Sequence, residues 1–139
     1  MSDIVVIGGG AAGMMAAVAA AGVDAGNNVI LIEKNEKLGK KVFITGKGRC
    51  NVTNACEVQE HSKFLYSAVY GFDNQAVMRF FESAGCPLKI ERGQRVFPVS
   101  DHSSDIIKAL EQELKRLKVQ VYLNTEVKNI RTMQLENIS

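Results

Sequence analysis

The chain has 139 residues, of which 46% are hydrophobic, and a formal net charge of +2. This length fits one domain, and the apolar content is sufficient for a buried core, which excludes an intrinsically disordered chain. The small charge gives no reason to expect a nucleic-acid partner, and the three cysteines, an odd number in a chain without a signal sequence, favour a reducing, cytoplasmic compartment.

The amino-terminal stretch predicts a buried strand over Ile4–Ile7, a glycine-rich turn and a helix over about residues 11–21. The turn has the pattern Gly-x-Gly-x-x-Gly, at Gly8, Gly10 and Gly13. In a dinucleotide-binding turn these glycines permit the tight bend, the approach of a pyrophosphate and the close packing of helix on strand, respectively. The free N–H groups at the helix start, including Ala11 and Ala12, and the helix dipole would then face the phosphates.

A second strand, Asn28–Ile32, follows a loop and ends at Glu33, which lies 20 residues after Gly13. A carboxylate about 20 residues beyond the glycines is expected to accept hydrogen bonds from a ribose. This context predicts an adenine dinucleotide site, although the residues alone do not distinguish FAD from NAD, and a glycine-rich turn of another α/β unit remains the alternative.

The apolar stretch Ile4–Val23 also resembles a membrane span or a signal peptide. Its five glycines, the preceding Asp3 and the lack of a basic region before it argue against both, so we expect no membrane partner.

The segment from Val42 to Asn54 is rich in Gly, Lys, Asn and Thr, which suits a backbone that wraps closely around a ligand rather than a packed element. It is not a P-loop, because Gly46 and Lys47 are followed by Gly48 and not by Ser or Thr. The lysines before it could equally form a solvated surface, and too few aromatic residues interleave with them for a nucleic-acid patch.

The rest of the chain predicts further elements in order. These are a short helix over Ser62–Tyr70; a helix capped by Asp73 or Asn74 and closed by Gly85, whose Val77, Phe80, Phe81 and Ala84 we assign to packing; strands Leu88–Glu91 and Arg95–Val99; an amphipathic helix from Ser103 or Ser104 to Lys118; a strand Val119–Leu123; and a further strand beginning at Val127 and Ile130. Residues 131–139 have no apolar pattern that we can assign.

No catalytic residue or metal site can be identified from the sequence. The two histidines, His61 and His102, are far apart, and no Cys-x-x-Cys pair is present, so we expect no zinc site.

The run Gly46–Asn54, with the pattern Gly-Lys-Gly-Arg-Cys-Asn-x-Thr-Asn, together with the amino-terminal turn and Arg95–Pro98, resembles a family of bacterial flavoproteins that includes aminoacetone oxidase and a dehydro-bile-acid reductase. The resemblance implies FAD as cofactor, with NAD(P) as the alternative. It places the glycines on the pyrophosphate, Glu33 on the adenosine ribose, and Arg49, Cys50 and Asn51 along the ligand towards the flavin. The full set of expected cofactor-binding residues is Gly8, Gly10, Ala11, Ala12, Gly13, Glu33, Lys34, Lys41, Gly48, Arg49, Cys50 and Asn51.

The first two strands and Val119–Leu123 are expected to form a parallel half-sheet in the order 3-2-1. Together with the resemblance, this predicts the fold class: α/β, a Rossmann-like FAD-binding half-domain with a helical insertion and short strands. Residues 1–55 would carry the phosphate and ribose motif and the glycine-rich loop, 56–102 the insertion, and 103–130 a helix and the return strand, with 131–139 unassigned. Members of the family are longer, so we expect the carboxy-terminal portion to be absent.

Three functions remain open at this point. The first is a flavoprotein oxidoreductase, or its amino-terminal fragment, that transfers hydride through flavin to or from an unknown small molecule; the others are a non-catalytic dinucleotide-binding domain and an inactive fragment. The apolar first strand would lie at a sheet edge, which predicts self-association or a completing partner chain.

Overall fold

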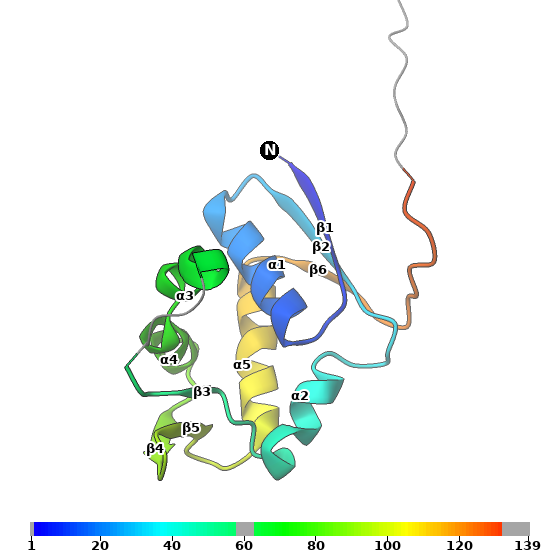
Figure 1. Cartoon of the computed structure of the whole chain (residues 1–139). Helices are drawn as coiled ribbons and strands as arrows, with labels where there is room; N and C mark the ends of the chain where they lie inside the picture. The colour runs from blue at the N-terminus through cyan, green and yellow to red at the C-terminus, as the bar shows by residue number, and fades with distance from the viewer. Residues whose placement is uncertain (1, 58–62, 132–139) are drawn as a thin grey trace, which may run out of the picture.

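Three parallel strands form the larger of two sheets in the computed structural model, which describes residues 2–57 and 63–131 (Figure 1). The strands are β1 (Asp3–Ile7), β2 (Asn28–Ile32) and β6 (Gln120–Tyr122), in the order β1-β2-β6. Val5 pairs with Ile30, and Leu31 pairs with Val121. The predicted 3-2-1 order of parallel strands is therefore confirmed.

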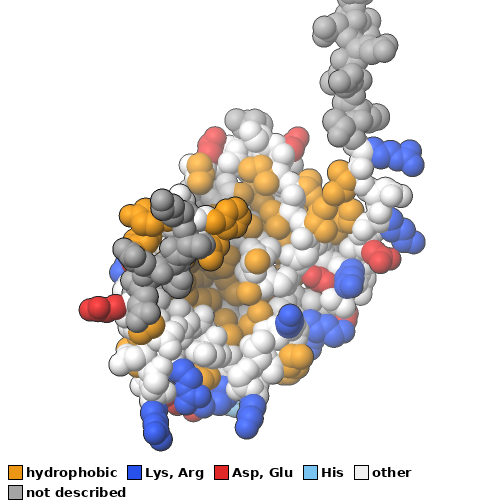
Figure 2. All heavy atoms as spheres, viewed as in Figure 1, with side chains coloured by type: hydrophobic (Ala, Val, Ile, Leu, Met, Phe, Trp, Pro, Cys, Tyr) orange, Lys and Arg blue, Asp and Glu red, His pale blue; other side chains and the backbone are white. Residues whose placement is uncertain are grey.

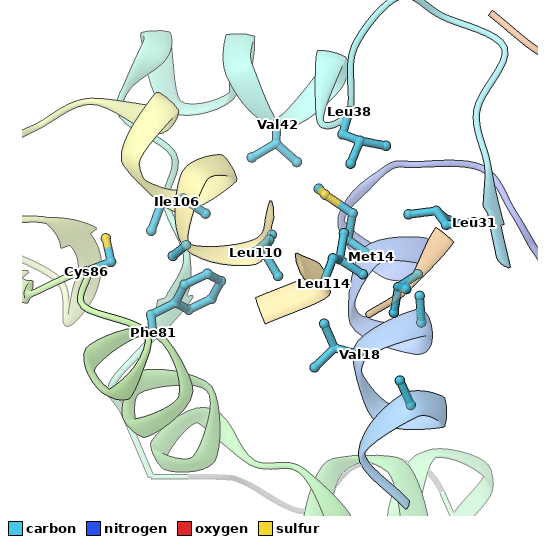
Figure 3. Packing of buried hydrophobic residues seen from close by; sticks show 14 of the residues in the cluster. Met14, Val18, Leu31, Leu38, Val42, Phe81, Cys86, Ile106, Leu110 and Leu114 are labelled. Atoms are coloured by element: carbon cyan, nitrogen blue, oxygen red, sulfur yellow. The ribbon is translucent and has the colours of Figure 1, made fainter. Parts of the chain in front are cut away.

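Helix α1 (Ala11–Val23) lies on one face of this sheet, and α5 (Ser103–Arg116) packs against α1 (Figure 1). The many alanines of α1 allow its backbone to approach closely, whereas α5 presents one apolar stripe. The fully buried Met14, Leu31, Leu110 and Leu114 meet between these elements, as Figure 3 shows. The hydrophobic core therefore lies on this side of the sheet.

The other face of the sheet carries apolar side chains with no element packed on them in the described chain. Because side chains alternate along a strand, the parallel register places one set of residues on this face. Val5, Ile7 and Tyr122 are about half exposed, at 53%, 51% and 50%. We call this surface the open sheet face and define it as Val5, Ile7, Ile30, Ile32 and Tyr122.

The described segment between β2 and α5 includes residues 40–54 as well as the region expected to be an insertion, 56–102. Its elements are α2 (Lys40–Ile44), the 3-10 turn η1 (Thr45–Gly48), β3 (Thr53–Asn54), the 3-10 turn η2 (Lys63–Leu65), α3 (Tyr66–Gly71), α4 (Asn74–Ser83), β4 (Leu88–Glu91) and β5 (Arg95–Pro98). Strands β3, β5 and β4 form a small antiparallel sheet, in that order. Asp73 caps α4, because its side chain accepts a hydrogen bond from the N–H of Ala76 at 2.7 Å. The predicted cap and the β4–β5 hairpin are confirmed.

Two local expectations are wrong. Residues 40–44 form a packed helix instead of an open loop, because Val42 is buried and the Ser103 hydroxyl donates to the carbonyl of Phe43 at 2.8 Å, which holds α2 against α5. No strand begins at Val127 or Ile130 within the described residues up to 131. In the described chain, the last hydrogen bond before this segment is at Thr125, whose N–H donates to the carbonyl of Glu33 at 2.9 Å.

Some expectations concern residues outside the described ranges: His61, Ser62 and residues 132–139. In the described part, no helix is both long and apolar enough to cross a membrane. Over the same residues, no group of three or more His, Cys, Asp or Glu side chains is arranged to hold a metal ion.

Candidate dinucleotide site

The glycine-rich turn joins the end of β1 to the start of α1 and is fixed by two glycines that the fold requires. Gly8 has a φ of +102°, and its N–H donates to the carbonyl of Ile32 at 2.8 Å. A Cβ on Gly13 would lie only 1.7 Å from the carbonyl oxygen of Gly8. These two glycines allow the bend and the close approach of helix to strand, as the sequence predicts.

Gly10 differs from both, because nothing within the described chain requires a glycine there. It precedes α1 with φ −80° and ψ −173°, an extended conformation that any residue adopts, and a Cβ on it would meet no atom within 4 Å. No side chain among residues 2–57 and 63–131 caps the helix, so the N–H groups of its first turn are free of side-chain partners in this part of the chain. The turn therefore has open space directly above the helix start, where the macrodipole favours an anion.

Glu33 lies beside this turn and is 7% exposed. Its Oε2 accepts a hydrogen bond from the N–H of Gly9 at 2.6 Å, and its Oε1 accepts from the backbone N–H and the side-chain amide of Asn35 at 2.8 and 2.7 Å. A carboxylate has about four acceptor sites, so one remains for a ribose hydroxyl. Glu33 thus shapes the glycine-rich turn in addition to the role expected from sequence, and sequence reasoning missed Gly9 and Asn35.

Burial raises the pKa of Glu33, but the hydrogen bonds from Asn35 and Gly9 outweigh it and leave the pKa below its usual value. An acid whose pKa is lowered in the folded state stabilises the fold above its unfolded pKa, about 4.3 for Glu, and loses that contribution as the pH falls through the folded pKa. Once protonated, the Glu33 carboxyl would also direct an O–H donor at neighbours that are themselves N–H donors.

We therefore expect a pH-dependent difference between the wild type and Glu33→Gln. The variant melts at a lower temperature at pH 7, because its amide sets a donor against the backbone N–H donors, a loss of about 1–3 kcal/mol. The difference shrinks as the pH falls from 5 towards 3, because the wild-type carboxylate becomes protonated and then also carries a donor. Thermal unfolding followed by circular dichroism measures both, and a difference that stays constant over this range would contradict the assignment.

The second motif forms a tight turn from Thr45 to Asn51. Gly46, Lys47, Gly48 and Cys50 all have φ between +56° and +83°, and the N–H of Cys50 donates to the carbonyl of Thr45 at 3.1 Å. Positive φ is unfavourable for Lys and Cys, and such strained residues cluster at functional sites. The turn is therefore a second candidate for ligand contact.

The two motifs meet at an apolar cleft of about 270 Å³. Ala11 and Met15 of α1 line it together with Thr45 and Cys50, and residues from α4 and α5 complete its walls. Hydrophobic side chains gather at the centre of the face seen in Figure 2. Burial raises the pKa of the Cys50 thiol, which keeps it neutral and makes it a packing group rather than a nucleophile.

The structure places the remaining predicted residues in different surroundings. Ala12, Lys34 and Lys41 are exposed. The Asn51 side-chain amide, oriented with its nitrogen towards β5, donates to the carbonyls of Thr53 and Val96 at 3.0 and 3.2 Å. The Arg49 guanidinium instead contacts two acidic side chains, Glu91 and Asp101, which sequence reasoning missed because no local pattern marks them.

Comparisons with known proteins agree with this geometry. The model of the HI0933-like protein Rossmann domain matches residues 2–139. A 3-dehydro-bile acid delta(4,6)-reductase of Clostridium scindens is 38% identical over 136 residues, which cover 94% of this chain and 33% of the reductase. The chain thus spans about a third of the length of this curated relative.

Solved structures show the same fold in parts of larger chains. The open conformation of a flavocytochrome c3 fumarate reductase superposes with a TM-score of 0.55 and 28% identity, over 88% of this chain and 27% of that chain. THI4 of Thermovibrio ammonificans has a TM-score of 0.56 at 12% identity, over 87% and 37% of the two chains, and supports the fold alone. The parallel half-sheet, the glycine-rich turn and the family match together show that this chain belongs to the HI0933-like Rossmann-domain family.

Proposed function

We propose that the chain binds FAD across its glycine-rich turn and is the dinucleotide-binding part of a flavoprotein oxidoreductase. The observation that carries the proposal is Gly10, a glycine that neither backbone conformation nor packing of the described chain requires, at an uncapped helix start. A pyrophosphate that approaches the backbone here supplies the missing reason, since any side chain would occupy its place.

The second motif, which lies beside the glycine-rich turn, favours FAD over NAD(P). The strained segment Thr45–Asn51 joins the turn at one cleft, and a second contact surface suits a ligand that continues beyond the pyrophosphate. Two similar proteins, the bile-acid reductase and the flavocytochrome c3 fumarate reductase, carry names that support redox chemistry. A non-catalytic domain that binds a dinucleotide is the second candidate, because the chain covers a third of the reductase and no catalytic side chain has been identified.

The roles of the residues follow from their positions. The first turn of α1, at Ala11 and Ala12, offers N–H groups to the diphosphate, and Glu33 offers its remaining acceptor site to the adenosine ribose. The isoalloxazine of bound FAD would supply hydride transfer, and the protein would orient it and exclude water. The substrate is an unidentified small molecule. The free cysteines Cys50, Cys56 and Cys86 support work in the reducing cytoplasm.

A titration of FAD into the purified chain, followed by flavin fluorescence or calorimetry, tests the proposal. We expect the wild type to bind FAD and Glu33→Ala to bind it at least about tenfold more weakly, because a charged hydrogen-bond acceptor worth about 1.5–3 kcal/mol is lost. Glu36→Ala is the matched control, since this exposed carboxylate in the same loop is 3.6 Å from Lys40 and makes no contact with the turn.

Two results would contradict the proposal in different ways. Equal FAD affinity in the wild type and in folded Glu33→Ala would remove Glu33 from the site. A chain that binds NAD(P)H but not FAD would favour the second candidate function.

We further propose that the isolated chain self-associates through β1 and the open sheet face. Strand β1 lies at the sheet edge and carries unpaired backbone groups beside exposed Val5 and Ile7. We expect size-exclusion chromatography with light scattering to show a dimer or larger species for the wild type and a monomer for Val5→Lys. Val23→Lys, at the 85%-exposed end of α1, should behave like the wild type, and a wild type that is monomeric at tens of micromolar would contradict the proposal.

A further inference from the structure

We propose that Arg49 is a positioning residue for the proposed FAD site and not a ligand of the cofactor. Its guanidinium anchors the segment Thr45–Asn51 to the β4–β5 hairpin, so that the other side of this segment faces the cleft beside α1. The inference rests on the proposed function but differs from the expectation from sequence, which placed Arg49 along the ligand.

Two of the three guanidinium nitrogens are bonded within the protein, and the side chain is 33% exposed. Its Nε and Nη2 donate to Oδ1 of Asp101 at 2.8 and 2.6 Å, and Nη2 also donates to Oε1 of Glu91. The ring of Phe97 lies below it, 4.1 Å from its central carbon, in a cation–π contact. Nε and Nη2 are thus committed to carboxylates and one face of the guanidinium is covered by a ring, so a phosphate would have to compete with these partners.

The charges around Arg49 also argue against a contact with the cofactor. Lys89 completes the group, with its ammonium 2.7 Å from Oδ2 of Asp101 and 3.4 Å from Oε1 of Glu91, so two cations face two anions and the group is neutral. The hydrogen bonds from Arg49 lower the pKa of Glu91, and those from Lys89 and Arg49 lower the pKa of Asp101, so both remain ionised at neutral pH. A neutral group of this kind offers no net attraction to a diphosphate.

The backbone explains how the anchor acts at a distance. Gly48 and Cys50, on either side of Arg49, both have positive φ, so the chain reverses here and neighbouring side chains point in different directions. Cys50 lines the cleft with Ala11 and Met15, whereas Arg49 reaches the hairpin. Holding the Arg49 side chain therefore fixes a strained turn whose opposite side faces the candidate ligand space.

The acidic partners provide a test that separates the two roles. We compare FAD affinity in Arg49→Met, Glu91→Gln and Asp101→Asn; Asn is chosen because it tolerates the φ of +61° at position 101. A positioning role predicts that all three variants bind FAD more weakly, by about tenfold or more for Arg49→Met, since small displacements of a binding surface are costly. A direct contact predicts weaker binding for Arg49→Met alone, with unchanged or tighter binding when an acid is neutralised.

The reactivity of Cys50 gives a second measurement that needs no cofactor. Its thiol is buried, so labelling of the free protein with a maleimide, located by mass spectrometry, reports how well the segment is held. We expect faster labelling of Cys50 in all three variants and unchanged labelling of buried Cys86. Arg116→Met, which removes an exposed ion pair with Glu113, is the control and should leave Cys50 protected.

The outcomes distinguish this inference from the proposed function. If the wild type does not bind FAD, the proposed function fails, and faster Cys50 labelling in the variants still supports the anchor. Unchanged Cys50 labelling in folded variants, or unchanged FAD affinity in Glu91→Gln and Asp101→Asn, would overturn the positioning role.

Discussion

Gly13→Ala should lower the free energy of unfolding by about 2–4 kcal/mol, which is large for the addition of one methyl group. The new Cβ would lie 1.7 Å from the carbonyl oxygen of Gly8 and 3.7 Å from a methyl group of Val6. The oxygen belongs to the backbone of the turn, so the clash is relieved only if α1 moves away from β1. Urea unfolding followed by circular dichroism measures the loss.

Gly22→Ala is the control in the same helix. A Cβ there would meet no atom within 4 Å, and alanine favours helix over glycine by up to about 1 kcal/mol. We therefore expect Gly22→Ala to be neutral or stabilising. A Gly13→Ala variant as stable as Gly22→Ala would show that α1 does not depend on this close contact.

Gly10→Val should have the opposite profile: a nearly unchanged fold and no measurable binding of FAD. Its extended backbone suits valine, and nothing lies within 4 Å of the position that the new Cβ would take. The side chain would fill the space proposed for the pyrophosphate, with an expected loss of roughly a hundredfold or more in affinity, about 2.7 kcal/mol. Flavin fluorescence titration measures binding, and thermal unfolding checks the fold.

Gly10→Ala should lower the affinity for FAD by a smaller amount, because a single methyl group fills less space than the branched valine side chain. The comparison with Gly13→Ala separates the two kinds of glycine: one change damages the fold, the other only the site. Retention of FAD by Gly10→Val after purification would show that the turn does not hold the phosphates.

Short-range patterns predicted the fold well where the physical cause is local. The order of β1, α1 and β2 follows from an apolar strand and closely spaced glycines, and the Asp73 cap bonds to an N–H three residues away. The strand order of the half-sheet was also predictable, since it follows from the dinucleotide-binding pattern.

Long-range contacts explain what the sequence could not predict. Arg49 reaches Glu91 across 42 residues and Asp101 across 52, and nothing near Arg49 in the sequence indicates those partners. Helix α2 has only five residues and is held in place by its contact with α5. That contact is not visible in the sequence, so the composition of the segment indicated an open loop. The apolar Ile130 suggested a strand but is 79% exposed.

The one-sided core has a consequence for synthesis on the ribosome. Met14, Leu31, Leu110 and Leu114 are fully buried by α1, α5 and β2, without any contribution from the open sheet face. In a polypeptide as long as the reductase, the first third could therefore complete its core while later residues are still being translated, at about 5–20 residues per second. The open sheet face would then be the apolar surface that stays exposed after this core has formed.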